Sequence, residues 1–422
     1  MASISTEDIR QIACNFAIQQ PLQVHEFPHK GNINLHTYLI RSHQGESKQD
    51  FILQQINEKV FTRPDRVMDA MIASIDAQNR NITNLSDDDK SSWQVVELIP
   101  TQTGKRYYTE TKGPATGYWR MMVRIPNCKT HKSLSEITDE SARLNMAREA
   151  GRGLGLYGRL TADMDVSNLH NPLPGYRDTR NYYNQFHSVL RGCTNLVQAS
   201  DLLPEDDTVR LSTQEHFIVQ CDPETYKTRM ANPLAQDCIL LALESEKYCL
   251  TLQNALQSRK IRNVAIHGDT KLDNILFSVE SGKAAAVVDL DTIMPHTWLS
   301  DWGDMVRSLC NVAGETEPDM QNVKVDEQIF SAVADGFLSA SPEMSFVEQE
   351  LMVDAVMIIA LELGLRFFTD YLRGDNYFRL TNEDPKDLNL TRGRVQMTLF
   401  QRLHDRQDHL RSHLNMLANR AA

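Results

Sequence analysis

The segment from Val264 to Asp291, VAIHGDTKLDNILFSVESGKAAAVVDLD, limits the possible folds of this chain more than any other. Its short apolar runs are separated by a polar loop and by a Glu-Ser-Gly-Lys turn, a pattern that predicts a strand, a loop and then a hairpin. The loop carries Asp269 and Asn274, and the hairpin ends at Asp289. We therefore expect these three side chains to lie near one edge of the hairpin.

These residue types, in this order, suit phosphoryl transfer. One carboxylate accepts the proton of the attacking hydroxyl group, while an amide oxygen and a second carboxylate hold the magnesium ion that bridges the phosphates. Magnesium prefers oxygen ligands and keeps several waters, so two protein ligands are enough. We predict Asp269 as the catalytic base and Asn274 and Asp289 as the metal ligands; the alternative is that Asp269 only caps a turn.

The rest of the chain predicts a strand-rich N-terminal part and a helix-rich C-terminal part, with a boundary near Pro126. A recurring apolar pattern predicts a helix that opens at Pro64, and the polar run 84–92 predicts a loop. The expected N-terminal strands are residues 34–41, 51–56, 93–99 and 118–125.

Two helical patterns stand out after the boundary. A stripe at four- and three-residue spacing contains Gly151 and Gly158, and these glycines predict close packing against another helix. Leucines from Leu399 to Leu417 predict one long amphipathic helix at the end of the chain.

Composition excludes several classes of protein. The net charge of -12 argues against a nucleic-acid binder, which usually presents a basic face. The apolar stretch 353–365 is interrupted by Asp354 and Glu362 and is too short to span a membrane. Seven cysteines are scattered without a C-x-x-C pair, and the N-terminus has no apolar signal core, so we expect a cytoplasmic protein with reduced thiols. The sequence leaves the oligomeric state open.

The order H-G-D-x-x-x-x-N, followed by a strand that ends in V-D, resembles the aminoglycoside phosphotransferase and choline kinase superfamily. The segments GNIN…TYLI, WRMMVRIP and LGLRFFTDYLRGDNYF resemble, more narrowly, the N-acetylhexosamine 1-kinase group. The resemblance implies an α+β, bilobal, protein-kinase-like fold: a small antiparallel-sheet N-lobe that binds the nucleotide (1–125) and a larger, mainly helical C-lobe with the catalytic loop and acceptor-binding helices (126–422). It implies ATP and Mg²⁺ as cofactors and a small-molecule acceptor, a sugar or sugar-like compound, that is phosphorylated on a hydroxyl group.

The resemblance also implies roles for residues near the catalytic loop. Lys271 would neutralise the transferring phosphoryl group, unless it is an ordinary solvated lysine. Asp291 lies two residues after Asp289, so on a strand both side chains share a face. It is therefore predicted to help bind metal or substrate, with a turn cap as the alternative.

Further along the chain, Arg366 and Tyr377 match positions that contact the sugar in the hexosamine kinases. Arg366 lies in an apolar helix, where a buried charge needs a partner, whereas Tyr377 also fits an ordinary half-buried aromatic. Asp304 and Arg307, in D-W-G-D-M-V-R, are predicted to brace the catalytic loop.

The nucleotide side is less regular. Residues 29–34 would form the turn over the phosphates, and the hinge 121–125 would offer backbone groups to adenine. Gln54 stands where kinases usually place a strand lysine, which leaves one phosphate contact open. The predicted nucleotide-binding residues are Gly31, Asn32, Asn34, Gln54, Met122 and Val123.

Two other functions remain open. The same fold could take another acceptor, such as an aminoglycoside, an amino alcohol or a specialised metabolite, although Arg366 disfavours a cation. A pseudokinase is the third interpretation, and only the missing strand lysine supports it. Departures from the related pattern at His296 and at residues 175–178 argue for an acceptor other than the common hexosamine.

Overall fold

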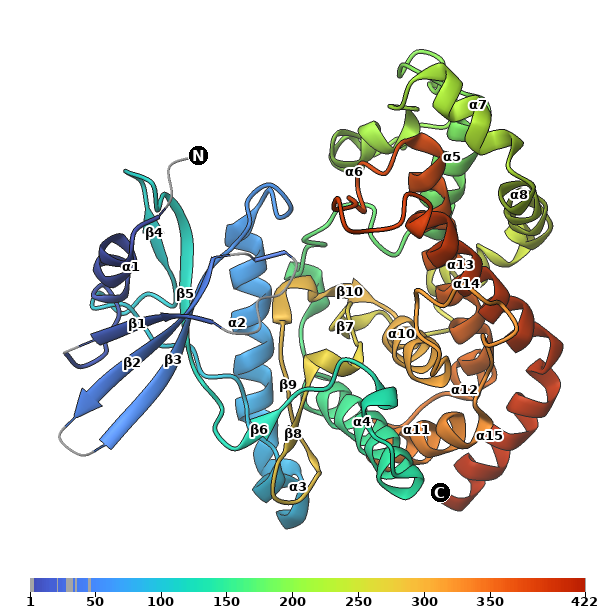
Figure 1. Cartoon of the computed structure of the whole chain (residues 1–422). Helices are drawn as coiled ribbons and strands as arrows, with labels where there is room; N and C mark the ends of the chain where they lie inside the picture. The colour runs from blue at the N-terminus through green and yellow to red at the C-terminus, as the bar shows by residue number, and fades with distance from the viewer. Residues whose placement is uncertain (1–3, 21, 28–32, 35, 45–46, 422) are drawn as a thin grey trace. The chain divides into compact units, whose positions relative to one another are not determined.

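The computed structural model describes residues 4–20, 22–27, 33–34, 36–44 and 47–421, and the chain divides into two compact units (Figure 1). The first unit comprises residues 1–129, 163–173 and 276–294, and the second comprises 130–162, 174–275 and 295–422. The first segment of the first unit ends at residue 129, four residues beyond the predicted end of the N-lobe at residue 125. Residues 163–173 and 276–294 also belong to the first unit, so one boundary in the sequence does not separate the two units. Asp289 consequently belongs to the first unit, whereas Asp269 and Asn274 belong to the second.

The first unit is built on an antiparallel sheet in which the strand order is β1-β2-β3-β5-β4. The strands are β1 (Leu22–Glu26), β2 (Thr37–Gln44), β3 (Ser47–Gln55), β4 (Tyr108–Glu110) and β5 (Gly117–Val123). Alternation along the strands gives the sheet two faces. One face supplies Leu53, Trp119 and Met121 to an apolar core that also contains residues of α1 (Thr6–Ala13). The other face carries a polar row, because Thr37 pairs with Gln54 and Gln54 pairs with Arg120.

Two local predictions in this unit are wrong. Residues 93–99 contain no strand, and only the single bridge from Leu98 to Met122 joins them to β5. Residues 87–92 form a helix, α3 (Asp87–Ser92), because the Ser86 hydroxyl accepts a hydrogen bond from the Asp89 N–H and caps its first turn. The helix predicted at Pro64 is confirmed as α2 (Pro64–Asn81).

The predicted hairpin is also present. β8 (Ile275–Ser278) lies between β6 (Cys128–Lys129) and β9 (Ala284–Val287) in a three-stranded sheet. A separate two-stranded sheet pairs β7 (Val264–Ile266) with β10 (Met294–His296). β7 and β8 flank the predicted catalytic loop, so the backbone around that loop is held at both ends.

The second unit is mainly helical (Figure 1), and most residues of α13 are buried. Its helices are α4 (Glu140–Leu160), α5 (Thr179–Leu190), α6 (Asp207–Thr213), α7 (Pro223–Ala231), α8 (Pro233–Ser245), α9 (Thr251–Gln257), α10 (Trp298–Cys310), α11 (Glu327–Ala340), α12 (Phe346–Glu350), α13 (Met352–Arg373), α14 (Leu388–Asp405) and α15 (Gln407–Ala421). The single C-terminal helix predicted from the leucine pattern is therefore two helices, since α14 ends before Arg406. Leu403 and Leu410 are nevertheless both buried.

α4 packs closely against α11, which confirms the helix packing predicted from the glycines of α4. A Cβ atom at Gly151 would lie 2.1 Å from the carbonyl oxygen of Val333 on α11. A Cβ atom at Gly158, on the same helix, would meet nothing nearer than the Cδ of Pro342 at 3.7 Å. Only the first glycine is required by helix contact.

This difference gives a testable pair of variants. We expect Gly151→Ala to lower the free energy of unfolding by about 1–3 kcal/mol, because the obstructing atoms belong to the backbone of α11. Gly158→Ala is the matched control and should raise that free energy by up to about 1 kcal/mol, since alanine favours the helix. Urea unfolding of both variants measures the difference, and equal losses would contradict the packing argument.

No helix in the described residues combines the length and the apolar character needed to cross a membrane.

Candidate active site

The loop between β7 and β8 brings together three of the predicted residues. The Asn274 Nδ2 donates hydrogen bonds to the backbone oxygen of Asp269 at 2.7 Å and to its Oδ2 at 2.9 Å. The Lys271 Nζ lies 3.0 Å from the same Oδ2. Gly268 has a φ of 86°, a conformation that glycine adopts without steric cost, and it turns the chain directly before Asp269. The Asp269 carboxylate is thus held by two side chains from its own loop.

The proposed metal ligands have suitable donor atoms. Because the Asn274 Nδ2 is directed at Asp269, the opposite amide oxygen is the atom left for a ligand, and it accepts no hydrogen bond from the described residues. Asp289 is exposed and directly follows the Val288 that ends the apolar run of the hairpin. Amide and carboxylate oxygens are the ligands that magnesium prefers, so the chemistry of both residues fits. In the described residues, no group of three or more His, Cys, Asp or Glu side chains could hold a metal ion.

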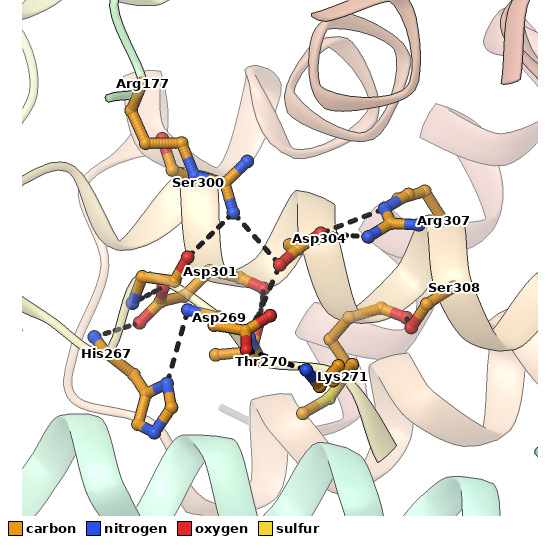
Figure 2. Close-up of polar contacts among 12 residues, drawn as sticks. Arg177, His267, Asp269, Thr270, Lys271, Ser300, Asp301, Asp304, Arg307 and Ser308 are labelled. Atoms are coloured by element: carbon orange, nitrogen blue, oxygen red, sulfur yellow. Dashed lines mark hydrogen bonds and ion pairs between the residues drawn. The ribbon is translucent and has the colours of Figure 1, made fainter. Parts of the chain in front are cut away.

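Asp301, in the first turn of α10, fixes the backbone of the catalytic loop (Figure 2). Its two carboxylate oxygens accept hydrogen bonds from the N–H groups of His267 and Gly268 at 2.7 and 2.8 Å. The Thr270 hydroxyl donates to the Asp301 carbonyl oxygen at 2.6 Å. Burial raises the pKa of Asp301, although these backbone donors and His267 partly offset that effect. The loop is therefore clamped on both sides of Asp269.

A second set of contacts surrounds Asp304 (Figure 2). Its carboxylate accepts hydrogen bonds from the Thr270 N–H at 3.3 Å, from Arg177 at 2.9 Å and from Arg307 at 2.6 Å. Burial alone would raise the pKa of Asp304, but Arg307 and Arg177 more than offset it and hold the pKa well below its usual range. Asp304 therefore contacts the loop directly, as predicted, whereas Arg307 acts on the loop through Asp304.

The sequence marks residues 175–178 as a departure that bears on the acceptor, but it does not predict that Tyr176 and Arg177 contact the loop before Asp269. The Tyr176 hydroxyl and the Arg177 guanidinium both donate to the carbonyl oxygen of Gly268, at 2.8 and 3.0 Å. Arg177 also contacts Glu362 of α13 at 3.3 Å. No local pattern reveals these long-range contacts, because the burial of Arg177 is visible only in the structure. Asp301 could have been found, because it lies three residues before Asp304 on the same helical face.

Arg366 lies in an aromatic cage in the second unit. Its guanidinium carbon is 5.1 to 5.7 Å from the ring centres of Tyr176, Tyr182, Tyr377 and Phe378. Within the described part of the chain it forms no hydrogen bond or ion pair. Burial would lower the pKa of Arg366, but the surrounding tyrosines and Glu362 raise it above its ordinary value, so the side chain remains a cation.

The neighbouring carboxylate cannot supply the missing partner. Glu362, one turn earlier on α13, already accepts hydrogen bonds from Arg177 at 3.3 Å and from the Thr179 hydroxyl at 2.9 Å. The Tyr176 ring lies against both Arg366 and Arg177, and its hydroxyl reaches the catalytic loop. The Arg366 cage is therefore connected to the residue before Asp269 by one side chain.

The loop after α13 places Tyr377 at this cage. The Asp370 carboxylate accepts hydrogen bonds from the N–H groups of Asn376, Tyr377 and Phe378 at 3.2, 3.0 and 2.8 Å. The Tyr377 ring is about half exposed and packs edge to face on His216, with ring centres 5.0 Å apart. Burial, together with Arg373 and Arg366, lowers the pKa of His216 to about 3, so this imidazole is neutral at physiological pH.

The predicted nucleotide residues in the first unit are placed less completely. Gly31 and Asn32 lie outside the described residues. Val123 belongs to the hinge that was predicted to offer backbone groups to adenine, and its N–H donates to the Glu97 carbonyl oxygen at 3.0 Å. Met122 forms the bridge with Leu98. The Val123 N–H is therefore not available to adenine, and the predicted hinge contact would have to come from other backbone groups of residues 121–125.

Asp289 and Asp291 do not share a strand face, so that prediction for Asp291 is wrong. β9 ends at Val287, and Asp289 has a left-handed backbone with φ 61° and ψ 55° that turns the chain. The Asp291 side chain is buried and pairs with Arg120, and its Oδ2 accepts a hydrogen bond from Asn34 at 2.5 Å. Both oxygens are therefore occupied, which favours a structural role over direct substrate contact.

The antiparallel-sheet unit, the helical unit and the clamped Asp269 loop define a kinase-like phosphotransferase. Residues 105–324, just over half of the 422-residue chain, match the model of the Phosphotransferase enzyme family. The chain belongs to this family and is a phosphotransferase.

Two solved structures share its fold. The microcompartment-associated aminopropanol kinase is 11% identical, with a TM-score of 0.54 over 96% of this chain and 98% of that one. A putative aminoglycoside phosphotransferase from Ralstonia eutropha is 12% identical, with a TM-score of 0.51 over 95% and 98% of the two chains. At these identities the likeness supports the protein-kinase-like fold alone.

Proposed function

We propose that this protein is a cytoplasmic, ATP- and Mg²⁺-dependent kinase that phosphorylates a hydroxyl group of a sugar or sugar-like acceptor. The observation that carries the proposal is the Asp269 carboxylate, which Asn274 and Lys271 hold at 2.9 and 3.0 Å in a loop that Asp301 clamps. A fixed carboxylate beside a cation and an amide is the set that phosphoryl transfer to a hydroxyl requires.

Each loop residue has one task in this proposal. Asp269 accepts the proton of the attacking hydroxyl, and Lys271 lies close enough to balance negative charge at the same place. Asn274 and Asp289 would hold magnesium, which when bound neutralises charge on the phosphates. Asp304, Arg177 and Asp301 keep the loop in place, so catalysis depends on positioning more than on covalent chemistry.

The acceptor is assigned to the Arg366 cage. A half-buried guanidinium whose N–H groups have no protein partner in the described residues favours oxygen-rich ligands, whereas amino alcohols and aminoglycosides carry positive charge that Arg366 would repel. Aromatic rings from Tyr176 and Tyr377 can pack against a sugar ring. The link from Tyr176 to Gly268 places this cage beside the catalytic loop.

Arg366→Met should raise the KM for the acceptor about tenfold to a hundredfold, because a hydrogen bond to a charged group contributes about 1.5–3 kcal/mol. The KM for ATP should stay within about twofold. The variant should fold normally, since Glu362 keeps Arg177 and Thr179 as partners.

Steady-state ADP release tests the proposal against hexoses, N-acetylhexosamines, amino alcohols and aminoglycosides. Arg402→Met, which removes an exposed arginine elsewhere in the same unit, is the matched control. Activity with a sugar that depends on Arg366 supports the assignment. Activity confined to cationic acceptors, unchanged or improved in Arg366→Met, would replace it with the amino-alcohol or aminoglycoside alternative. ATP binding without turnover of any acceptor in the panel would replace the sugar with another metabolite, whereas no turnover and no ATP binding would favour a pseudokinase.

A further inference from the structure

A closed ring of hydrogen bonds joins five side chains of the first unit. The Gln54 Oε1 accepts from the Arg120 Nη2 at 2.6 Å, and the Gln54 Nε2 donates to the Thr37 hydroxyl at 3.1 Å. That hydroxyl donates to the Asn34 carbonyl oxygen at 2.8 Å, and the Asn34 Nδ2 donates to Asp291 at 2.5 Å. The ion pair between Asp291 and Arg120 completes the ring.

The two charged side chains of the ring are buried and hydrogen-bonded within it. Arg120 and Asp291 are 2% and 3% exposed. The Arg120 Nε and Nη2 both donate to Gln54, and its Nη1 donates to Asp291 and contacts the Met71 sulfur at 3.3 Å. A buried ion pair contributes little net stability compared with apolar residues of similar size, so stability alone does not account for this arrangement. What the ring does is fix the segments to which its members belong.

One of these segments contains Asp289. A left-handed backbone is strained for any residue with a Cβ, and it persists only where the surroundings hold it. The next two residues, Leu290 and Asp291, are both buried, and Asp291 is anchored by Arg120 and Asn34. The anchor therefore fixes the turn from which the Asp289 carboxylate projects.

The other segment follows the predicted phosphate-covering turn. The Asn34 Oδ1 accepts from the Asn57 N–H at 2.9 Å, and the Asn57 Nδ2 donates to the Ile33 carbonyl oxygen at 2.9 Å. Asn34 is thus held by Asn57, which follows β3, on one side and by Asp291 on the other. The same ring fixes Asn34 and the turn at Asp289.

We propose that Arg120 is a positioning residue for binding of the metal–nucleotide complex, acting through Asp291 on Asp289 and through Gln54 and Thr37 on Asn34. This inference rests on the proposed function. It also accounts for the absence of a lysine at Gln54. The cation in this row of the sheet is Arg120 on β5, which pairs with Gln54 across the sheet, and Arg120 forms an ion pair with Asp291, two residues after the proposed metal ligand Asp289. Arg120 does not need to touch a phosphate, since each of its three side-chain nitrogens already donates to Gln54 or Asp291.

The test compares single and double variants. Arg120→Met leaves the buried Asp291 without its cation, so this variant should melt at a lower temperature. It should also bind Mg²⁺·ADP at least about tenfold more weakly, because breaking one buried ion pair changes an equilibrium constant by more than a factor of ten. Arg120→Met with Asp291→Leu removes both charges and should recover most of the melting temperature but not the Mg²⁺·ADP affinity. Arg41→Met, on the same sheet and paired with Asp50 at 2.7 Å, is the matched control and should bind as the wild type does.

Calorimetric titration with ADP, with and without Mg²⁺, gives a readout independent of turnover. A loss of affinity in the double variant that is largest when Mg²⁺ is present supports positioning of Asp289. Wild-type affinity in the double variant would overturn the inference, because the pair would then serve stability alone. Wild-type protein that binds no Mg²⁺·ADP would overturn the proposed function and the inference with it, so the two failures are distinguishable.

Discussion

Asp269→Asn should lower kcat by about a hundredfold to ten-thousandfold, the range expected for loss of a general base. The substitution keeps the size and shape of the side chain, and Asp301 and Asp304 continue to hold the loop backbone. It removes the negative charge that faces Lys271 at 3.0 Å and the oxygen that accepts the acceptor's proton. ATP affinity should stay within about threefold, because nothing assigns Asp269 to the nucleotide.

The control for this variant comes from the same loop. Asp273→Asn removes one carboxylate four residues along. It should leave kcat within about threefold, since Asp273 interacts with Lys271 and Asp269 only through charge and none of the hydrogen bonds that hold Asp269 involves its side chain. Single-turnover measurement with saturating ATP separates the chemical step from product release. Equal kcat values in wild type and Asp269→Asn would exclude Asp269 as the base.

Arg177→Met should lower the free energy of unfolding by about 3–5 kcal/mol, because it leaves the buried Glu362 without its cation and leaves Asp304 with Arg307 alone. Arg177 contacts Asp304 at 2.9 Å and Glu362 at 3.3 Å, and both acids are buried. It also donates to Gly268 at 3.0 Å, so the variant that remains folded should turn over more slowly than the wild type.

An exposed arginine provides the comparison. Arg191 pairs with Asp201 at 2.8 Å on the surface, with half or more of each side chain exposed, and Arg191→Met should change the unfolding free energy by less than about 1 kcal/mol. Urea unfolding at equal m-values measures both variants. Similar losses for Arg177→Met and Arg191→Met would mean that the buried network does not hold the site.

The contacts within the Asp269 loop could be predicted from the sequence because they are local. Asp269, Lys271 and Asn274 lie within six residues of one another, so their spacing alone brings them together. The helix packing at the glycines of α4 could be predicted for a similar reason, because helix geometry determines which residues share a face.

Long-range contacts could not be predicted in this way. Arg177 reaches Asp304 across 127 residues of sequence, and Arg120 reaches Asp291 across 171, and no periodic pattern encodes either pair. The expectation for Asp291 assumed that the strand continued beyond Asp289, but the left-handed residue ended it. The 93–99 segment has the apolar residues of a strand, yet it forms only one bridge, because pairing depends on the neighbouring chain.

The central claim is that this chain transfers the γ-phosphoryl group of ATP to a hydroxyl of a small acceptor. The most direct measurement incubates the protein with γ-labelled ATP, Mg²⁺ and the acceptor panel, and follows the label into organic phosphate by mass spectrometry. We predict a phosphate monoester of a sugar or sugar-like acceptor with the wild type, and none above background with Asp269→Asn. Label that appears only as inorganic phosphate, or equally with both proteins, would contradict the account.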